Sequence, residues 1–370
     1  MAALIDTSEA LASAMKTLRG VTQLAVDTES NSFHRYHERL CLLQLTAEVS
    51  GETLDFLIDP LVPGIDMAPL VKIFADTSIR KVFHDVGYDL VLIRRDLHVT
   101  PQTIFDTMLA LRFLGHKRFG LAAVLEERFQ VKANKALQRA DWSARPLSKA
   151  QLTYAAMDTH YLLPLTVQLE AELKEKGRWA WFEEECERLL KRPEAKGKSE
   201  EERFWAIKGL KKLKPEAMST AYALFQLREA RAKLQDRAVF RVMHNDTLLD
   251  IAERQPTTPK ELSQIPGVGP ALVQAIGDKI LASVREPAEF PLEKSKLKRT
   301  RGTPSEERAR DKRFEGLREK RRVAAEKLGV EPEVVLSNAT LWELAEDKAP
   351  NIAQHPDFKG WRADLAKEFG

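Results

Sequence analysis

Two acidic residues, Asp27 and Glu29, end an apolar run, Leu24-Ala25-Val26, close to the start of the chain. The run predicts a strand that enters a core, and alternate residues of a strand share a face, so the two Cα atoms lie roughly 6.5 Å apart on that face. Carboxylates buried side by side repel each other and lose hydration. Divalent cations would offset this cost, because hard metals bind oxygen ligands. The alternative is an exposed strand with two solvated acids.

Later apolar runs extend this strand into a sheet. Apolar and β-branched stretches predict strands, and amphipathic stretches predict helices. The predicted strands are residues 40–46, 53–58, 81–84 and 102–105, and the predicted helices between them are 68–74 and 90–95. Strands that first pair with one another and then alternate with helices predict an α/β domain, in which helices flank a mixed sheet.

Two more acids occupy positions at the ends or faces of predicted elements. Asp89 opens the helix that follows the strand at 81–84, and Asp85 is the other acid near that point. Asp158 lies on a helix one turn after Tyr154, and residues four apart on a helix share a face. A simple hydrogen bond between Tyr154 and Asp158 would also explain this spacing.

Length and composition point to a multidomain protein of the cytoplasm. A chain of 370 residues is expected to form two or three domains. No apolar run approaches 18 residues, so we expect no membrane span. Residues 1–19 predict an amphipathic helix capped by Thr7 or Ser8 rather than a signal peptide. The only cysteines, Cys41 and Cys186, lie far apart in the sequence, which favours a reduced protein of the cytosol without a disulfide framework.

The second half of the chain is polar at first and then helical. Residues 193–202 contain Pro193 and Gly197 within a charged run and predict a linker. An internal repeat follows, with its two copies about 90 residues apart: 227–231 matches 317–321, and 245–252 matches 338–345. Two related helical domains are therefore predicted.

A glycine-rich hairpin distinguishes the first helical copy from the second. Gly267 and Gly269 would allow a phosphate to approach the backbone and the start of the next helix, although a plain turn between helices has the same composition. In the second copy 355–360 replaces this hairpin, which argues against direct phosphate binding there. Basic residues outnumber acidic ones in 294–322, so this stretch could follow RNA phosphates or simply be a solvated linker.

Three short motifs together resemble the DEDDy superfamily of 3′→5′ exonucleases. They are Asp-x-Glu at 27–29, His-x4-Asp-Leu at 84–90, and Tyr-x3-Asp at 154–158. Their flanking segments 105–107, 141–147 and 154–163 are similar to the ribonuclease D family. This resemblance implies an α/β ribonuclease H-like exonuclease domain, a mixed sheet flanked by helices, followed by two all-α HRDC-like domains. The implied boundaries are 1–192 for the exonuclease domain, 193–202 for a linker, 203–287 for an HRDC domain, 288–304 for a basic linker and 305–370 for a second, divergent HRDC-like domain.

The same resemblance implies the chemistry. Two divalent cations, Mg²⁺ or Mn²⁺, would stabilise the oxygens that enter and leave the phosphorus. Their ligands would be Asp27, Glu29, Asp89 and Asp158. Tyr154 would orient the attacking water, because a tyrosine with a pKa near 10 is a poor base at neutral pH. We choose Asp89 over Asp85 because Asp89-Leu90 fits the motif of the family.

Substrate and partners follow from the resemblance and from the polar loop 30–39. RNA, in particular tRNA precursors with 3′ extensions, is the expected substrate, nucleoside 5′-monophosphates are the expected products, and no obligate protein partner is evident. His84, Phe33 and Arg39 are expected to contact the terminal nucleotides, and Gly267 and Gly269 the phosphates. Two other functions stay open: a 3′→5′ DNA exonuclease on the same catalytic frame, and a non-catalytic nucleic-acid-binding adaptor.

Overall fold

The computed structural model describes residues 2–132, 135–193, 197–287, 303–346 and 351–369. It contains one sheet of six strands, in the order β1-β4-β3-β2-β5-β6. The strands are β1 (Ala3–Ile5), β2 (Gln23–Ser30), β3 (Leu40–Val49), β4 (Glu52–Ile58), β5 (Arg80–Phe83) and β6 (Ile104–Asp106).

The sheet is mixed, as predicted. Strands β2, β3 and β4 are antiparallel neighbours, whereas β5 runs parallel to β2, β6 runs parallel to β5, and β1 runs parallel to β4. The strand that carries Asp27 and Glu29 is therefore central, with β3 on one side and β5 on the other. β5 pairs only with Gln23–Ala25, whereas Asp27 and Glu29 lie beyond that pairing and are held by β3, opposite Gln44 and Leu42.

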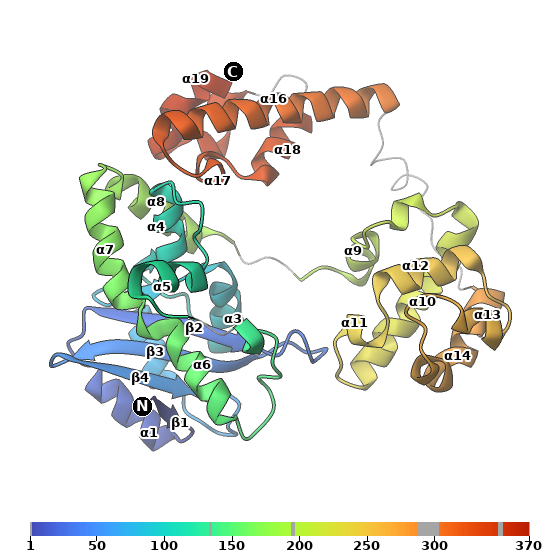
Figure 1. Cartoon of the computed structure of the whole chain (residues 1–370), viewed down its shortest axis with the longest axis horizontal. Coiled ribbons are helices and arrows are strands. Elements are labelled where there is room, and N and C mark those ends of the chain that lie inside the picture. Colours follow the sequence, from blue (N-terminus) through green and yellow to red (C-terminus); the bar gives the residue numbers. More distant parts are fainter. Residues whose placement is uncertain (1, 133–134, 194–196, 288–302, 347–350, 370) are drawn as a thin grey trace. The chain divides into compact units, whose positions relative to one another are not determined.

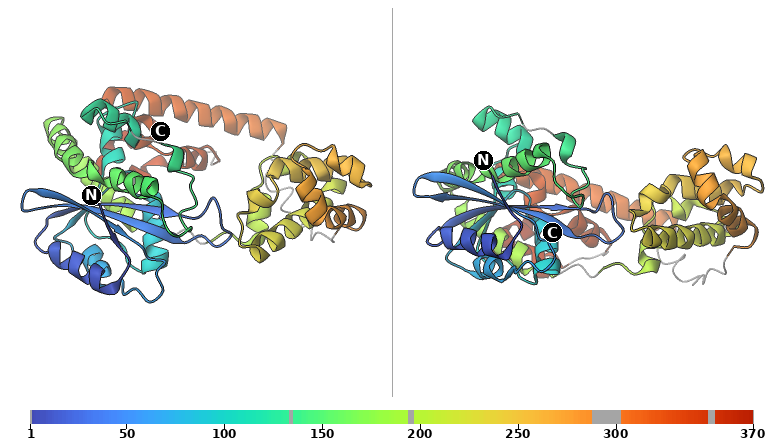
Figure 2. Two further views of the ribbon diagram at one scale, coloured as in Figure 1. Left: turned by 60° about the horizontal axis from the view of Figure 1, so that its bottom comes forward. Right: turned by 90° about the horizontal axis from the view of Figure 1, so that it is seen from below.

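Helices cover both faces of the sheet (Figures 1 and 2), with α1 on one face and α6 on the other. Thr7 caps the first helix, as predicted, and its side chain accepts a hydrogen bond from the Ala10 amide at the start of α1; the strand β1 before it was not predicted. The helices of this part are α1 (Ser8–Thr17), α2 (Ala68–Ala75), α3 (Gly87–Leu97), α4 (Thr107–Phe113), α5 (Leu121–Phe129), α6 (Lys149–His160), α7 (Leu162–Glu175) and α8 (Trp179–Lys191).

The first helical copy has a core of its own, built from buried side chains such as Phe204, Phe225 and Ile280. A capping box at Ser199 and Glu202 starts its first helix, so the predicted linker 193–202 gives way to helix at Glu200. Within the linker, residues 194–196 lie outside the described residues. The helices are α9 (Glu200–Trp205), α10 (Pro215–Leu234), α11 (Val239–Val242), α12 (Asn245–Arg254), α13 (Pro259–Ser263) and α14 (Pro270–Arg285).

The second helical copy shares a hydrophobic core with the sheet domain. Its buried Val335 and Phe358 belong to the same cluster as Phe113 and Phe182. Its helices are α16 (Pro304–Leu328), α17 (Pro332–Val335), α18 (Asn338–Glu346) and α19 (Ala366–Phe369). Of the predicted basic linker 288–304, residues 288–302 lie outside the described residues.

Polar contacts also hold the second copy to α8. The Trp361 amide donates to Glu184 (3.0 Å), the Trp361 indole N–H donates to Glu185 (3.2 Å), and the Arg362 guanidinium forms a buried ion pair with Glu185. Gly360 has a φ of +60°, and a Cβ there would overlap the Glu184 carboxylate. This hairpin therefore packs directly on the sheet domain.

Buried arginines correct the register of the predicted repeat. Arg228 donates to the Met243 carbonyl (3.2 Å), and Arg321 donates to the Leu336 carbonyl (2.9 Å), fifteen residues later in both cases. The two copies are thus offset by 93 residues throughout, so Arg228 corresponds to Arg321. The match of 227–231 with 317–321 was wrong by three residues, because similar charged letters recur on both helices, whereas 245–252 was aligned correctly.

The described chain divides into two compact units that do not follow the order of the sequence. One unit holds residues 1–30, 40–193 and 301–370, and the other holds 31–39 and 194–300. The loop 31–39 therefore belongs with the first helical copy, to which Tyr36 is joined by a hydrogen bond from its hydroxyl to Glu229 (3.2 Å). Both cysteines are buried and neither forms a disulfide. Among the described helices, none is both long enough and apolar enough to cross a bilayer.

Candidate active site

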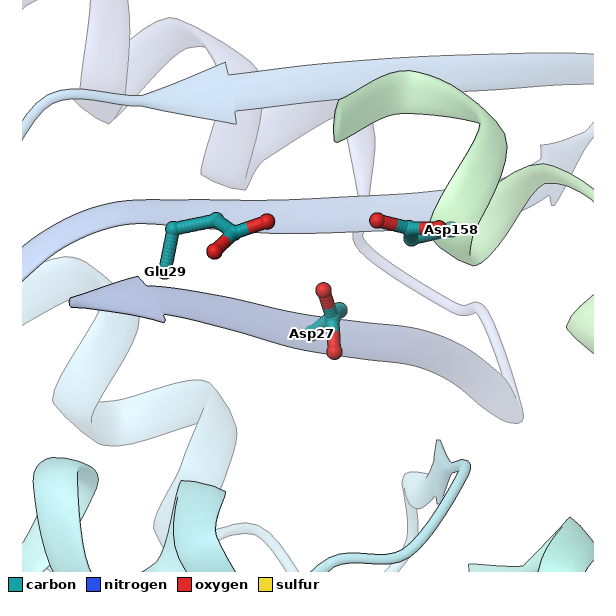
Figure 3. Close-up of side chains that lie close together, drawn as sticks. All are labelled: Asp27, Glu29 and Asp158. Atoms are coloured by element: carbon teal, nitrogen blue, oxygen red, sulfur yellow. The ribbon is translucent and has the colours of Figure 1, made fainter. Parts of the chain in front are cut away.

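Three carboxylates from two elements meet on one face of the sheet. Asp27 and Glu29 come from β2 and Asp158 from α6, and one oxygen of each lies within 4.8 Å of the others. Figure 3 shows the three side chains pointing toward one another. The strand places Asp27 and Glu29 on the same face, as predicted, and α6 brings Asp158 over that face from a point 129 residues after Glu29 in the sequence.

This arrangement strongly disfavours ionisation of the carboxyl groups in the absence of a counter-charge. Burial raises the pKa of Asp27 to about 7, against the hydrogen bond from the Thr28 amide. Burial, and then the charge of Asp27, raise the pKa of Asp158 to about 8. Burial and the three neighbouring acids raise the pKa of Glu29 well above its usual value. A cluster of this kind accepts cations, because positive charge relieves both the repulsion and the loss of hydration.

Asp89, the fourth predicted ligand, lies beside the cluster rather than in it. Its buried carboxylate accepts a hydrogen bond from the Thr28 hydroxyl (2.5 Å), on the strand residue between Asp27 and Glu29. Burial, and then the charge of Asp27, raise the pKa of Asp89 well above its usual value. Asp85, the alternative ligand, lies in a different setting: its amide donates to Asp106 (3.1 Å), and burial followed by the Asp106 charge raises its pKa. The pKa of Asp89, but not that of Asp85, responds to the charge of Asp27.

Tyr154 lies one helical turn before Asp158, and the two side chains are hydrogen-bonded. Burial, and then the charges of Asp158, Glu29 and Asp27, raise the pKa of Tyr154 above its usual range. The phenol is therefore protonated at neutral pH. Its ring packs against the buried Trp142, with the ring centroids 5.9 Å apart.

An arginine holds the segment that carries Trp142. The Arg145 guanidinium pairs with the buried Asp59 and donates to the carbonyls of Cys41 (2.8 Å) and Trp142 (2.7 Å). The segment 141–147 thus holds the Trp142 indole against the Tyr154 ring.

Helix α6 is also fixed to the sheet by polar side chains. The Thr46 hydroxyl lies 2.7 Å from both Thr159 and Asp55, and the His160 ring lies 2.9 Å from Asp55. These contacts are made by the two residues that follow Asp158, so the position of its carboxylate depends on β3 and β4 as well as on its own helix.

The residues predicted to contact terminal nucleotides have other contacts. His84 Nδ1 lies 2.8 Å from the buried Thr107 hydroxyl, its Nε2 is buried, and burial lowers its pKa to about 4, so the ring is neutral and held by the protein. Phe33 packs edge-on against Phe240 of the first helical copy, with centroids 6.3 Å apart. The Arg39 amide donates to Asn31 (2.8 Å) within the same loop. A role of His84, Phe33 and Arg39 in substrate binding stays a prediction.

A basic groove of about 470 Å³ lies on the first helical copy, beside the predicted hairpin. Three arginines, an aromatic ring and the hairpin glycines line it: Arg231, Arg237, Arg241, Phe240, Gly267 and Gly269. No acidic residue is among the described residues of this lining. Gly267 has a φ of +82°, and a Cβ there would lie 2.1 Å from the Thr247 hydroxyl, so the turn requires glycine. Gly269 has no such neighbour and is open.

The second helical copy does not keep the arginines of this groove. At the offset of 93 residues its counterparts of the three arginines are Ala324, Val330 and Val334, and that of Phe240 is Glu333. Gly360 is the counterpart of Gly267, because it follows Thr340 by twenty residues, just as Gly267 follows Thr247. Gly360 packs against α8. The same hairpin is therefore open in one copy and covered in the other.

The basic stretch 294–322 is largely engaged where the structure describes it. In α16, Arg322 pairs with Glu319 and Glu326, Arg318 pairs with Glu315, and Arg321 is buried. The groove of the first copy is therefore the better candidate for phosphate contacts. Sequence reasoning missed this groove, although arginines interleaved with an aromatic residue over 231–244 are a signal for binding a single strand.

Comparisons with known proteins identify the family of the chain. Residues 2–174 match the family model described as 3′-5′ exonuclease, and residues 219–284 and 310–354 match the HRDC domain. A Ribonuclease D of Zymomonas mobilis is 31% identical over 299 residues, which cover 78% of this chain and 74% of that protein. A Ribonuclease D of Granulibacter bethesdensis is 30% identical over 375 residues, covering 98% and 90%. The crystal structure of Escherichia coli RNase D, an exoribonuclease involved in structured RNA processing, aligns with a TM-score of 0.70 and 26% identity over 100% of this chain and 98% of that one.

Proposed function

Because the chain belongs to the ribonuclease D family and is a 3′→5′ exoribonuclease, we propose that it trims RNA with the help of two divalent cations, Mg²⁺ or Mn²⁺, held by Asp27, Glu29, Asp89 and Asp158. The observation that carries this proposal is the convergence of three carboxylates beside a tyrosine on a chain of this family. The proposed substrates are tRNA precursors with 3′ extensions in the cytoplasm, and the proposed products are nucleoside 5′-monophosphates.

The residues present fit such cations. The cluster offers only oxygen donors, which Mg²⁺ and Mn²⁺ prefer, and its raised pKa values indicate that it needs a counter-charge to ionise fully. When bound, the cations supply positive charge to the oxygens that enter and leave the phosphorus.

The tyrosine has a positioning role in this proposal. Its hydroxyl is held by Asp158 and its ring is held by Trp142, so the oxygen can orient a water molecule for in-line attack. The raised pKa of Tyr154 argues against a role as general base, because the phenol keeps its proton at neutral pH.

The groove of the first helical copy is the proposed path for the RNA strand upstream of its 3′ end. Arg231, Arg237 and Arg241 provide positive charge, and Phe240 provides a surface for base stacking. The open Gly269 is the N-cap of α14, and the free amides of the first turn after Pro270 favour a phosphate.

A nuclease assay on labelled RNA tests the catalytic part. A tRNA precursor labelled at its 5′ end should give a ladder that shortens from the 3′ side with Mg²⁺ or Mn²⁺, and no ladder with chelator. Chromatography of the released products should give nucleoside 5′-monophosphates, and Asp158→Asn should be inactive. A matched DNA strand measures the preference for ribose. Cleavage that persists in chelator would refute the metal-dependent mechanism.

A pair of charge variants tests the groove. Arg237→Ala should weaken the binding of a single strand of about twelve nucleotides, and the slope of log Kd against log salt should fall by about one. Lys279→Ala changes an exposed charge on α14 outside the groove and should leave this slope unchanged. Equal slopes for both variants would refute the proposed role of the groove in RNA binding, while the catalytic proposal would be unaffected.

A further inference from the structure

Gln44 lies beside the cluster of carboxylates, on the strand next to the one that carries Asp27. It is on β3, and its Cα is the direct partner of the Asp27 Cα in the antiparallel pairing of β2 with β3. Residues paired in this way project their side chains from the same face of the sheet, with Cβ atoms about 4.5–5.5 Å apart. Gln44 therefore shares the face on which Asp27 and Asp158 meet.

The other residues of β3 confirm which element covers this face. Thr46, two residues further along the strand, contacts Thr159 of α6, the residue that follows Asp158. Gln44 itself has no exposed surface. Its amide is thus enclosed between the sheet and the helix that delivers a predicted ligand.

The Gln44 side chain has no hydrogen-bond partner among the described residues, although both its oxygen and its nitrogen are buried. An amide without partners in a protein interior is destabilising, and native proteins rarely contain one without a reason. All residues from Leu40 to Ala47 are buried, and most are apolar, so folding alone would be served better by leucine or methionine at position 44. The amide therefore calls for an explanation outside the stability of the fold.

We propose that Gln44 is a positioning residue of the active site, whose amide N–H group donates to the Asp27 carboxylate when that carboxylate holds a cation. This inference rests on the proposed metal-dependent function. Ligating carboxylates are commonly oriented by hydrogen bonds from neighbouring side chains. The terminal torsion of glutamine is broad, so the amide can turn toward Asp27 at little cost. A residue with this role lowers the stability of the metal-free protein and strengthens its binding of the cation.

The affinity for Mn²⁺, measured by titration calorimetry on the full chain, separates this role from a structural one. Gln44→Met keeps the volume and removes the amide, so it should weaken Mn²⁺ binding by about 10- to 100-fold, while the metal-free protein unfolds at the same temperature or higher. Leu45→Met is the matched control, because Leu45 lies on the same strand but points to the opposite face, and it should leave the affinity for Mn²⁺ unchanged.

The outcomes distinguish this inference from the function on which it rests. Absence of Mn²⁺ binding by the unmodified protein would refute the metal-dependent function. Equal affinities of the unmodified protein and Gln44→Met would refute the role of Gln44 alone. If Gln44→Met does not fold, Gln44→Asn serves instead: it keeps an amide but withdraws it by one methylene group, so it should also weaken Mn²⁺ binding, and an unchanged affinity would overturn the proposal.

Discussion

The attachment of the second helical copy to α8 depends on one buried carboxylate, Glu185. It receives hydrogen bonds from the Trp361 indole (3.2 Å) and Arg188 (3.2 Å) and pairs with Arg362. Only 7% of Glu185 and 6% of Arg362 is exposed to solvent. Arg362 also donates to the carbonyls of Val334 (2.6 Å) and Val335 (2.8 Å), which hold the guanidinium in place. A guanidinium held there cannot move to solvent when its counter-charge is removed.

Glu185→Gln should therefore destabilise the protein. Breaking a buried ion pair from one side costs about 3–5 kcal/mol, and the lower end applies here because glutamine keeps the size and a carbonyl acceptor. At about 2–4 °C per kcal/mol for a unit of this length, the unfolding temperature should fall by roughly 6–12 °C. Scanning calorimetry measures this change, and hydrogen exchange should show faster exchange in α16–α19.

Glu187→Gln is the matched control on the same helix. Glu187 pairs with Lys191 at 2.8 Å, but both side chains are mostly exposed, so the loss should stay below about 0.5 kcal/mol. If Glu185→Gln and Glu187→Gln unfold within about 2 °C of each other, the buried pair does not hold the second copy, and the reasoning is wrong.

Three further changes test the active site. Asp89→Asn should abolish RNA hydrolysis without changing the circular dichroism spectrum, whereas Asp85→Asn should retain RNA hydrolysis. The reverse result would show that Asp85, and not Asp89, is the metal ligand. Tyr154→Phe should bind Mn²⁺ normally and yet lower the single-turnover rate by about 100-fold, because it loses only the oxygen that orients water; a matching loss of Mn²⁺ affinity would contradict that role. The metal-free protein should become less stable as the pH rises from about 4 to about 8, since the pKa values of Asp27 (about 7) and Asp158 (about 8) are raised by folding and the folded state binds more protons over this range. Thermal melts should also show the largest stabilisation by Mg²⁺ above about pH 7, and a flat pH profile without metal would contradict the raised pKa values.

Local periodicity accounts for much of the site that the sequence could predict. The alternation of a strand places Asp27 and Glu29 on one face, and the pitch of a helix places Tyr154 next to Asp158. Neither rule brings α6 over β2; that step rested on the resemblance to a known family. Asp89 shows the limit of the method, because its hydrogen bond to Thr28 joins positions 61 residues apart and leaves the carboxylate beside the cluster rather than within it.

Contacts between residues far apart in the sequence could not be predicted from local patterns. The polar and aromatic character of the loop 30–39 predicts a contact with nucleotides, but it does not report the partners of the loop within the protein. In the structure, Tyr36 bonds to Glu229, 193 residues away, and Phe33 packs on Phe240. No local pattern reports on partners so distant. The importance of Gln44 was hidden for the same reason: a glutamine in an apolar strand is informative only once its neighbour across the sheet is known.

The two helical copies show how one hairpin can serve opposite purposes. In the first copy, arginines surround the turn at Gly267 and no carboxylate among the described residues closes the groove, so a polyanion is the complementary ligand. In the second copy the arginines are replaced by Ala324, Val330 and Val334, and the turn at Gly360 is covered by Glu184 of α8. A carboxylate on the hairpin amide of one copy occupies the place that a phosphate is proposed to take in the other. If RNA binds the first copy as proposed, the same turn faces a polyanion in one copy and a carboxylate of its own chain in the other.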